Sequence, residues 1–242
     1  MNHNNYEQFK FNDSIYNIEV LKNEAKNNNG NIGIYQDNIY CPECGNARLK
    51  FTNETSKRRC FLSAIDSNEH IKGCNYLLPK ITKKEIESIF KQFNEEECKD
   101  KINALMRQLC SNDDIQDKDK EVTNTSKENQ FDITNKKSNK KETKFLKTKS
   151  LNKPIDFSIE NEDICAYYGR NVKLSAVEKN KEGGIYYLLC ISTNIGDVEV
   201  FYYLNADEYN PNDRFNIVCI GYVKYKKIQL IHNKKSIKIV KV

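Results

Sequence analysis

Residues 41–45 read Cys-Pro-Glu-Cys-Gly, and residues 70–74 read His-Ile-Lys-Gly-Cys. Each stretch holds two metal-ligating side chains at the spacing of a tight turn, and two such turns can bring four ligands into a tetrahedron. A glycine directly after the first pair lets backbone amides approach the sulfurs, because it has no Cβ. The spacing predicts a structural Zn²⁺ site, with no open position for a substrate, formed by Cys41, Cys44, His70 and Cys74.

Cys60 is an alternative ligand to His70. Residues 49–51 and 58–62 alternate apolar with charged or polar side chains, which predicts a β-hairpin between the two turns. Cys60 would then lie within a strand, whereas His70 shares a turn with the closing cysteine. Residues 32–40 are expected to form a further strand leading into the first turn.

The bulk composition limits the class of protein. A chain of 242 residues permits one large domain or two small ones. Nine cysteines, an odd number, favour reduced thiols and metal ligands over disulfides, so we expect a cytoplasmic protein. No run approaches the roughly 18 apolar residues that span a bilayer, and residues 1–10 are too polar for a signal peptide, so we expect no membrane partner.

Two amphipathic helices are expected after the second turn. Thr82 and Glu85 have the spacing of a capping box, and apolar residues follow at helical spacing up to Phe93. A second helix carries its apolar side chains at Cys98, Ile102, Leu105, Met106 and Leu109. We expect the two helices to form a hairpin that packs against the zinc-binding module, which gives a first domain at residues 1–110. This hairpin could also bind a protein partner.

Residues 111–153 are dominated by Asp, Lys, Asn, Ser and Thr. Such a segment buries too little apolar surface to offset the entropy of ordering it, so we expect a flexible charged linker. The pattern becomes all-β in residues 154–242, with turn-forming breaks between candidate strands at 164–177, 186–192, 198–204, 215–231 and 236–242. Segment 215–231 is long enough to bend at Gly221 or to form two strands. The expected fold class is therefore α+β with two domains, a small zinc-ribbon-like module with a helical hairpin followed by an OB-like β-barrel.

The carboxy-terminal region carries the candidate nucleic-acid contacts. The formal net charge of the chain is only +5, but no Asp or Glu follows Asp213, and a one-signed field attracts polyanions. In segment 198–204 the valines share a face with Tyr202, so the neighbouring aromatic rings lie on the opposite face, where bases could stack. We expect contacts from Phe201, Tyr203, Tyr225, Lys224, Lys226 and Lys227.

Residues 15–78, with the motifs at 40–45, 49–51 and 70–74, resemble the zinc-binding amino-terminal region of competence-protein-like bacterial nucleases. Those families carry a His-Phe-x-His element before the closing Cys, whereas this chain has Arg59-Cys60-Phe61-Leu62-Ser63, and no nuclease body follows. Segments 164–173 and 217–240 resemble single-strand-binding OB domains. The resemblance implies a bacterial protein that contacts nucleic acid.

These observations predict a zinc-containing protein that binds nucleic acid, single-stranded rather than duplex, through the barrel and has no enzymatic activity. Metal-dependent nucleases need clustered carboxylates, often with a nearby lysine, and the Glu-x-Lys pattern of Glu142-Thr143-Lys144 falls in the expected linker. Two alternatives remain open. One is an adaptor that binds protein partners, since barrels and zinc modules serve both purposes. The other is a nuclease-related enzyme.

Overall fold

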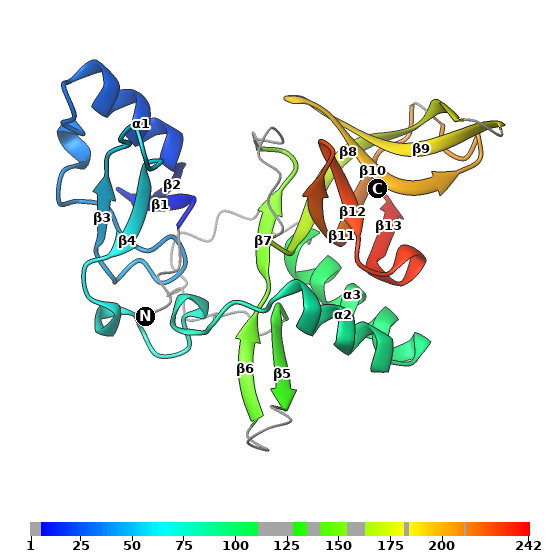
Figure 1. The fold of residues 1–242 in the computed structure, drawn as a ribbon, viewed down its shortest axis with the longest axis horizontal. Coiled ribbons are helices and arrows are strands. Elements are labelled where there is room, and N and C mark those ends of the chain that lie inside the picture. Colours follow the sequence, from blue (N-terminus) through cyan, green and yellow to red (C-terminus); the bar gives the residue numbers. More distant parts are fainter. Residues whose placement is uncertain (1–5, 111–127, 135–140, 154–162, 182–183, 211) are drawn as a thin grey trace. The chain divides into compact units, whose positions relative to one another are not determined.

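The computed structural model describes residues 6–110, 128–134, 141–153, 163–181, 184–210 and 212–242. These residues divide into two compact units, 6–79 and 80–242. Helices and strands occur in both units, so the protein is of the α+β class that the sequence predicts (Figure 1). None of the helices in the described ranges is long and apolar enough to cross a membrane.

The first unit consists of two short hairpins, one helix and several turns. Its elements are β1 (Gln8–Phe11), β2 (Ser14–Asn17), α1 (Ile18–Asn27), η1 (Gly33–Tyr35), β3 (Leu49–Thr52), β4 (Phe61–Ala64), η2 (Ser67–Glu69) and η3 (Asn75–Leu77). β1 pairs with β2 and β3 with β4, both antiparallel, and the second hairpin is the one that the sequence predicts. The expected strand at 32–40 is wrong, because Gly33 and Asp37 have φ of 57° and 61°, which interrupts an extended chain.

The turn between β1 and β2 follows directly from its sequence. Asn12 and Asp13 are its two central residues, with φ of 45° and 63°. Positive φ at both positions is what a type I′ hairpin turn requires, and Asn and Asp tolerate it better than other non-glycine residues.

The second unit contains two helices and a seven-stranded sheet. Its elements are α2 (Lys83–Gln92), α3 (Glu95–Cys110), β5 (Gln130–Thr134), β6 (Lys141–Phe145), β7 (Lys147–Ser150), β8 (Cys165–Lys181), β9 (Gly184–Thr193), β10 (Gly196–Leu204), β11 (Phe215–Lys224), β12 (Lys227–Leu230), η4 (Asn233–Ser236) and β13 (Ile237–Lys241). The strand order is β13-β11-β12-β10-β9-β8-β7, and an additional pairing of β11 with β8 partly closes the sheet into a ring (Figure 1). The β10–β12 and β7–β8 pairs are parallel, and the other pairs in this sheet are antiparallel.

Strand β11 is buried on both faces. Ile217 and Cys219 belong to a core inside the ring, whereas Val218 and Ile220 belong to a second core that includes the helices. A strand that is covered on both faces needs apolar side chains at successive positions, which explains the continuous apolar run at residues 217–220. At Gly221 an added Cβ would collide with the backbone of β12, so a glycine is required where the two strands approach closely.

Helices α2 and α3 share their hydrophobic core with the sheet. Thr82 and Glu85 form the predicted capping box at the start of α2. Phe90 and Leu105 are fully buried in one cluster with Val218 of β11, and Figure 1 shows the helices beside β11 and β13. The helices belong to the second unit rather than to the first domain expected at residues 1–110, because their apolar stripes are covered by the outward-facing apolar residues of β11 and β8.

Part of the expected linker forms strands. β5 and β6 pair as an antiparallel hairpin, and β7 joins the large sheet beside β8. Phe131 and Leu146 are buried in the core of the helices, and Leu151 is buried inside the ring. The linker prediction is therefore wrong for 128–134 and 141–153, because a few widely spaced apolar residues have partners elsewhere in the chain. Residues 111–127 and 135–140 of this prediction lie outside the described residues.

Candidate metal centre and nucleic-acid interface

Two tight turns carry the predicted metal ligands of the first unit. In the first turn the amide of Gly45 donates to the carbonyl of Cys41 at 2.9 Å, and Gly45 has φ of 66°, which explains the glycine. In the second turn the amide of Cys74 donates to the carbonyl of Ile71 at 3.0 Å, and Gly73 has φ of 97°. Each turn therefore bends the chain so that its two ligands lie on the same side.

The two turns bring together the four predicted ligands Cys41, Cys44, His70 and Cys74. Their ligating atoms all lie within 4.8 Å of one another. Sγ of Cys41 is 3.8 Å from Sγ of Cys74, and Sγ of Cys44 is 3.3 Å from Nδ1 of His70. Zinc–sulfur bonds of about 2.3 Å in a tetrahedron separate two sulfurs by about 3.8 Å, so the donor set fits such an ion. All nine cysteines are free thiols, and these four residues are close enough to hold a metal ion.

Cys60 lies outside this cluster. It directly precedes β4 and is half-buried, and burial raises the pKa of its thiol. Within the described residues it is His70 that completes the set of four.

The hydrogen bonds within the cluster shift the pKa values of Cys41 and Cys74 in opposite directions. The hydrogen bond from the Cys74 thiol, with a further one from His70, outweighs burial and lowers the pKa of Cys41 to about 4. The same hydrogen bond with Cys41 raises the pKa of Cys74, and burial adds to this. One sulfur is therefore already a thiolate at neutral pH, and metal binding displaces the remaining protons.

Residues far away in the sequence support the ligands from outside. The hydroxyl of Tyr6 lies 2.9 Å from Nε2 of His70, which can donate to it when Nδ1 faces the sulfurs. The Tyr6 ring stacks on Tyr76 with centroids 4.3 Å apart. The carboxylate of Glu43 accepts from the amide of Asn75 at 3.0 Å and so links the two turns, and burial raises its pKa. Sequence spacing could not identify these contacts.

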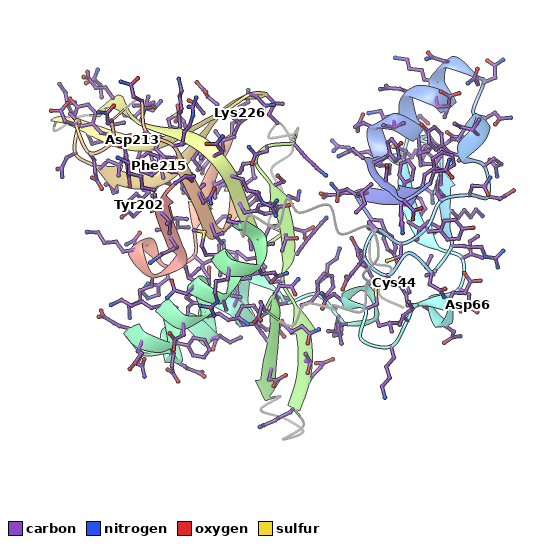
Figure 2. The ribbon with its side chains drawn as sticks, turned by 180° about the vertical axis from the view of Figure 1, so that it is seen from behind. Cys44, Asp66, Tyr202, Asp213, Phe215 and Lys226 are labelled. Atoms are coloured by element: carbon purple, nitrogen blue, oxygen red, sulfur yellow. The ribbon has the colours of Figure 1, made fainter. Side chains whose placement is uncertain are left out.

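A cap orients the chain before the second turn. Asp66 caps η2 by accepting from the amide of Asn68 at 2.8 Å, and His70 follows this short helix directly. Figure 2 labels Asp66 and Cys44, which lie on the same unit.

The predicted aromatic residues of β10 lie on the outside of the ring of strands. Val198 and Val200 are buried, whereas the side chains of Phe201 and Tyr203 are 38% and 60% exposed, as the alternation predicts. The two exposed rings have centroids 5.3 Å apart, and Tyr186 of β9 lies 5.7 Å from Tyr203. The sequence did not select Tyr186, because its proximity depends on the pairing of β9 with β10.

The turn between β11 and β12 carries Tyr225 and Lys226 as its two central residues. Their φ values are 54° and 57°, and Lys224 pairs with Lys227 on either side. This is the positive-φ pattern that Asn12 and Asp13 adopt in the first unit, but Tyr and Lys adopt it only at a cost. Tyr225 is 66% exposed, and Nζ of Lys224 lies 4.9 Å from the centroid of its ring.

Lys227, which the sequence predicts to contact phosphate, forms an ion pair in the structure. Its Nζ lies 2.6 Å from a carboxylate oxygen of Glu199 on β10. Because β10 and β12 are parallel with Val200 opposite Ile228, this pair lies between the turn at residues 225–226 and the rings further along β10. The structure therefore does not place Phe201 and Tyr203 directly beside Lys226, which is labelled in Figure 2.

The Glu-x-Lys pattern lies on β6 rather than in a linker. Nζ of Lys144 is 2.9 Å from Glu85 and 3.6 Å from Glu142, so the lysine lies between the two carboxylates. Asp132 of β5 is paired with Thr143 and is bonded to its hydroxyl at 2.7 Å, which places it on the other face of the hairpin. Within the described residues, the cysteine–histidine set is the group that lies close enough together to hold a metal ion.

No protein-family model, curated protein or solved structure matches this chain.

Proposed function

We propose that the protein binds single-stranded nucleic acid through an OB-like barrel in its second unit and contains a structural zinc ion in its first. The support for the barrel is the closed order β8-β9-β10-β12-β11-β8, in which the third and fifth strands are parallel neighbours. A small five-stranded barrel of this connectivity is an OB-fold, which binds oligonucleotides on strands two and three and at the loops joining strands one and two and strands four and five. The equivalent elements here are β9, β10 and the turn at residues 225–226.

The observation that carries the proposal is the group of three rings on β9 and β10. Tyr186, Phe201 and Tyr203 lie together, and the two rings of β10 are exposed at the position where an OB-fold binds its ligand. A base stacked on such a ring contributes about 1 to 3 kcal/mol, so this group supplies useful affinity without sequence preference. The turn of Tyr225 and Lys226 adds support, since strained backbone is retained mainly where the side chains have a role.

Three thiolates and one imidazole are the donor set that zinc takes in structural sites. Bound there, the ion would cross-link the two turns and leave no position for a substrate. We therefore assign it to the folding of the first unit. The resemblance to the zinc-binding module of competence-protein-like nucleases is consistent with this role, and we propose no catalytic step.

The test is a fluorescence-anisotropy titration of labelled single-stranded DNA and RNA with the full-length protein at low and high salt. We expect binding that weakens as salt rises, because phosphate contacts release counterions. Tyr203→Ala should weaken binding by about tenfold, since it removes a stacking surface. Tyr203→Phe is the matched control, because it keeps the ring and removes only the hydroxyl, and it should bind like the wild type.

Three results would contradict the proposal. Absence of binding at low salt would favour a protein-binding adaptor. Equal loss of binding in Tyr203→Ala and Tyr203→Phe would exclude ring stacking. Cleavage of the oligonucleotide on addition of magnesium or manganese would show a nuclease.

A further inference from the structure

Glu199 holds two lysines on the surface that carries the rings. One oxygen of its carboxylate lies 2.7 Å from Nζ of Lys179 on β8, and the other lies 2.6 Å from Nζ of Lys227 on β12. The side chains of Lys179 and Lys227 are each 26% exposed, and that of Glu199 is 27% exposed. The three side chains are therefore partly exposed at the surface, although the Glu199 oxygen that faces Lys227 is itself buried.

The cluster and the rings occupy one continuous face. Glu199 alternates with buried Val200 and so shares the outer side of β10 with Phe201 and Tyr203. Lys179 is the direct cross-strand partner of Tyr186, whose ring contacts Tyr203. A strand of nucleic acid stacked on the rings and extending toward the turn at 225–226 would pass over this cluster.

The arrangement resembles a phosphate site that already holds an anion. A carboxylate and a phosphodiester each carry one negative charge and present two acceptor oxygens to ammonium groups. Burial alone would raise the pKa of Glu199, but the hydrogen bonds from the two lysines lower it, so the group is a carboxylate at neutral pH.

We propose that Lys179 and Lys227 form a phosphate-binding position for the single strand, and that Glu199 is an intramolecular competitor for it. This inference rests on the proposed function. When nucleic acid binds, a phosphate can reach the two lysines in one of two ways. Either it displaces the Glu199 carboxylate from them, or it binds beside that carboxylate and is repelled by its negative charge. Glu199 therefore lowers the affinity of this surface for single-stranded nucleic acid, because Lys179 and Lys227 are already paired with its carboxylate.

The experiment is to measure the dissociation constant of Glu199→Gln for labelled oligothymidylate over a series of salt concentrations, using the full-length metal-loaded protein. Removing one like charge near a solvent-exposed phosphate is expected to tighten binding about five- to tenfold. The slope of log K against log salt should become steeper by about 0.7 to 1.4, which corresponds to one or two additional phosphate contacts on a single strand.

Asp213→Asn is the matched control. It changes the net charge by the same amount and breaks an ion pair of the same length, 2.6 Å, with Lys241. Asp213 lies just before β11, at the opposite end of that strand from Lys226 (Figure 2). We expect less than a twofold change in affinity, with thermal melting used to confirm that both variants are folded.

A second substitution tests the lysine directly. Lys179→Gln should weaken binding only slightly in the wild-type background, where Glu199 already occupies the lysine. In the Glu199→Gln background the same change should remove most of the gain in affinity, which is the coupling that a double-mutant cycle detects.

The outcomes separate the two proposals. If the wild type binds and loses binding in Tyr203→Ala, but Glu199→Gln behaves like Asp213→Asn, the phosphate site is wrong and the proposed function stands. If the wild type does not bind, the proposed function fails and this inference fails with it. If Glu199→Gln does not fold, Glu199→Ala takes its place, with Asp213→Ala as its control. Tighter binding with a steeper salt slope in Glu199→Ala alone supports the site, and equal binding in the two variants overturns it.

Discussion

The two units differ in what holds them together. In the first unit the paired strands β1, β2, β3 and β4 are each four residues long, and two turns carry four metal ligands. In the second unit β8 is 17 residues long, and hydrophobic cores cover both faces of β11. Within the described residues the first unit has one hydrophobic core cluster and the second has two. If the first unit binds zinc as proposed, we expect its stability to depend on the four ligands, and that of the second unit to depend on extended packing.

Loss of the metal should have the largest effect, and it should affect the first unit alone. A chelator or Cys74→Ser should unfold the first unit, because binding of a structural zinc supplies on the order of 10 kcal/mol to the folding of small domains. Hydrogen exchange followed by mass spectrometry should show lost protection in residues 6–79 and unchanged protection in the β8–β12 ring. Cys60→Ser is the control and should keep the metal, and loss of the metal in that variant would overturn the ligand set.

Leu105→Ala should show to which unit the helices belong. Leu105 is fully buried in the core that α3 shares with β11, so the truncation should destabilise the second unit by about 2 to 5 kcal/mol. Chemical denaturation measures the loss, and the metal content should not change. Lys99→Ala, at an exposed position of the same helix, should change stability by less than about 0.5 kcal/mol.

Tyr6→Phe tests whether the hydroxyl beside His70 contributes to metal affinity. It removes the hydroxyl that lies 2.9 Å from Nε2 of His70 and leaves the ring stacked on Tyr76. Loss of such an outer partner typically weakens metal affinity by about tenfold or more, which competition with a chromophoric chelator measures. Tyr35→Phe is the control, because its ring packs against Phe11 in the same unit and it should bind metal normally.

Replacing Tyr225-Lys226 by Asn-Gly should have the smallest effect on stability. Unlike the other changes, it should stabilise the protein. The new residues adopt positive φ with little strain, so the second unit should gain about 1 kcal/mol in denaturation experiments. Binding of single-stranded DNA should weaken at the same time. A variant that is more stable and binds as well as the wild type would show that this turn has no part in the interface.

Several features of the molecule follow from short stretches of chain. The turns at 41–45 and 70–74, the capping box of Thr82 and Glu85, and the inside–outside alternation of β10 could all be predicted, because neighbouring residues determine each of them. The strands of the ring could be predicted for the same reason, since turn-forming breaks separate alternating segments.

Other features depend on partners that lie far apart in the sequence. The amphipathic helices were recognisable, but nothing in their own sequence says that β11 covers them. The hydrophobes of 128–153 are too sparse to predict strands until their partners in the second unit are known. The contacts of Tyr6 with His70, and of Glu199 with Lys179 and Lys227, arise only when separate segments meet.

The sequence by itself determined the ligand spacing, the helical and strand periods and the outward direction of Phe201 and Tyr203, since these depend on backbone geometry over a few residues. Only the tertiary structure decided which core the helices join, how the strands close into a ring and which charges pair on its surface. The reason is that apolar faces and charged side chains have many possible partners, and the choice among them depends on how well whole surfaces fit together.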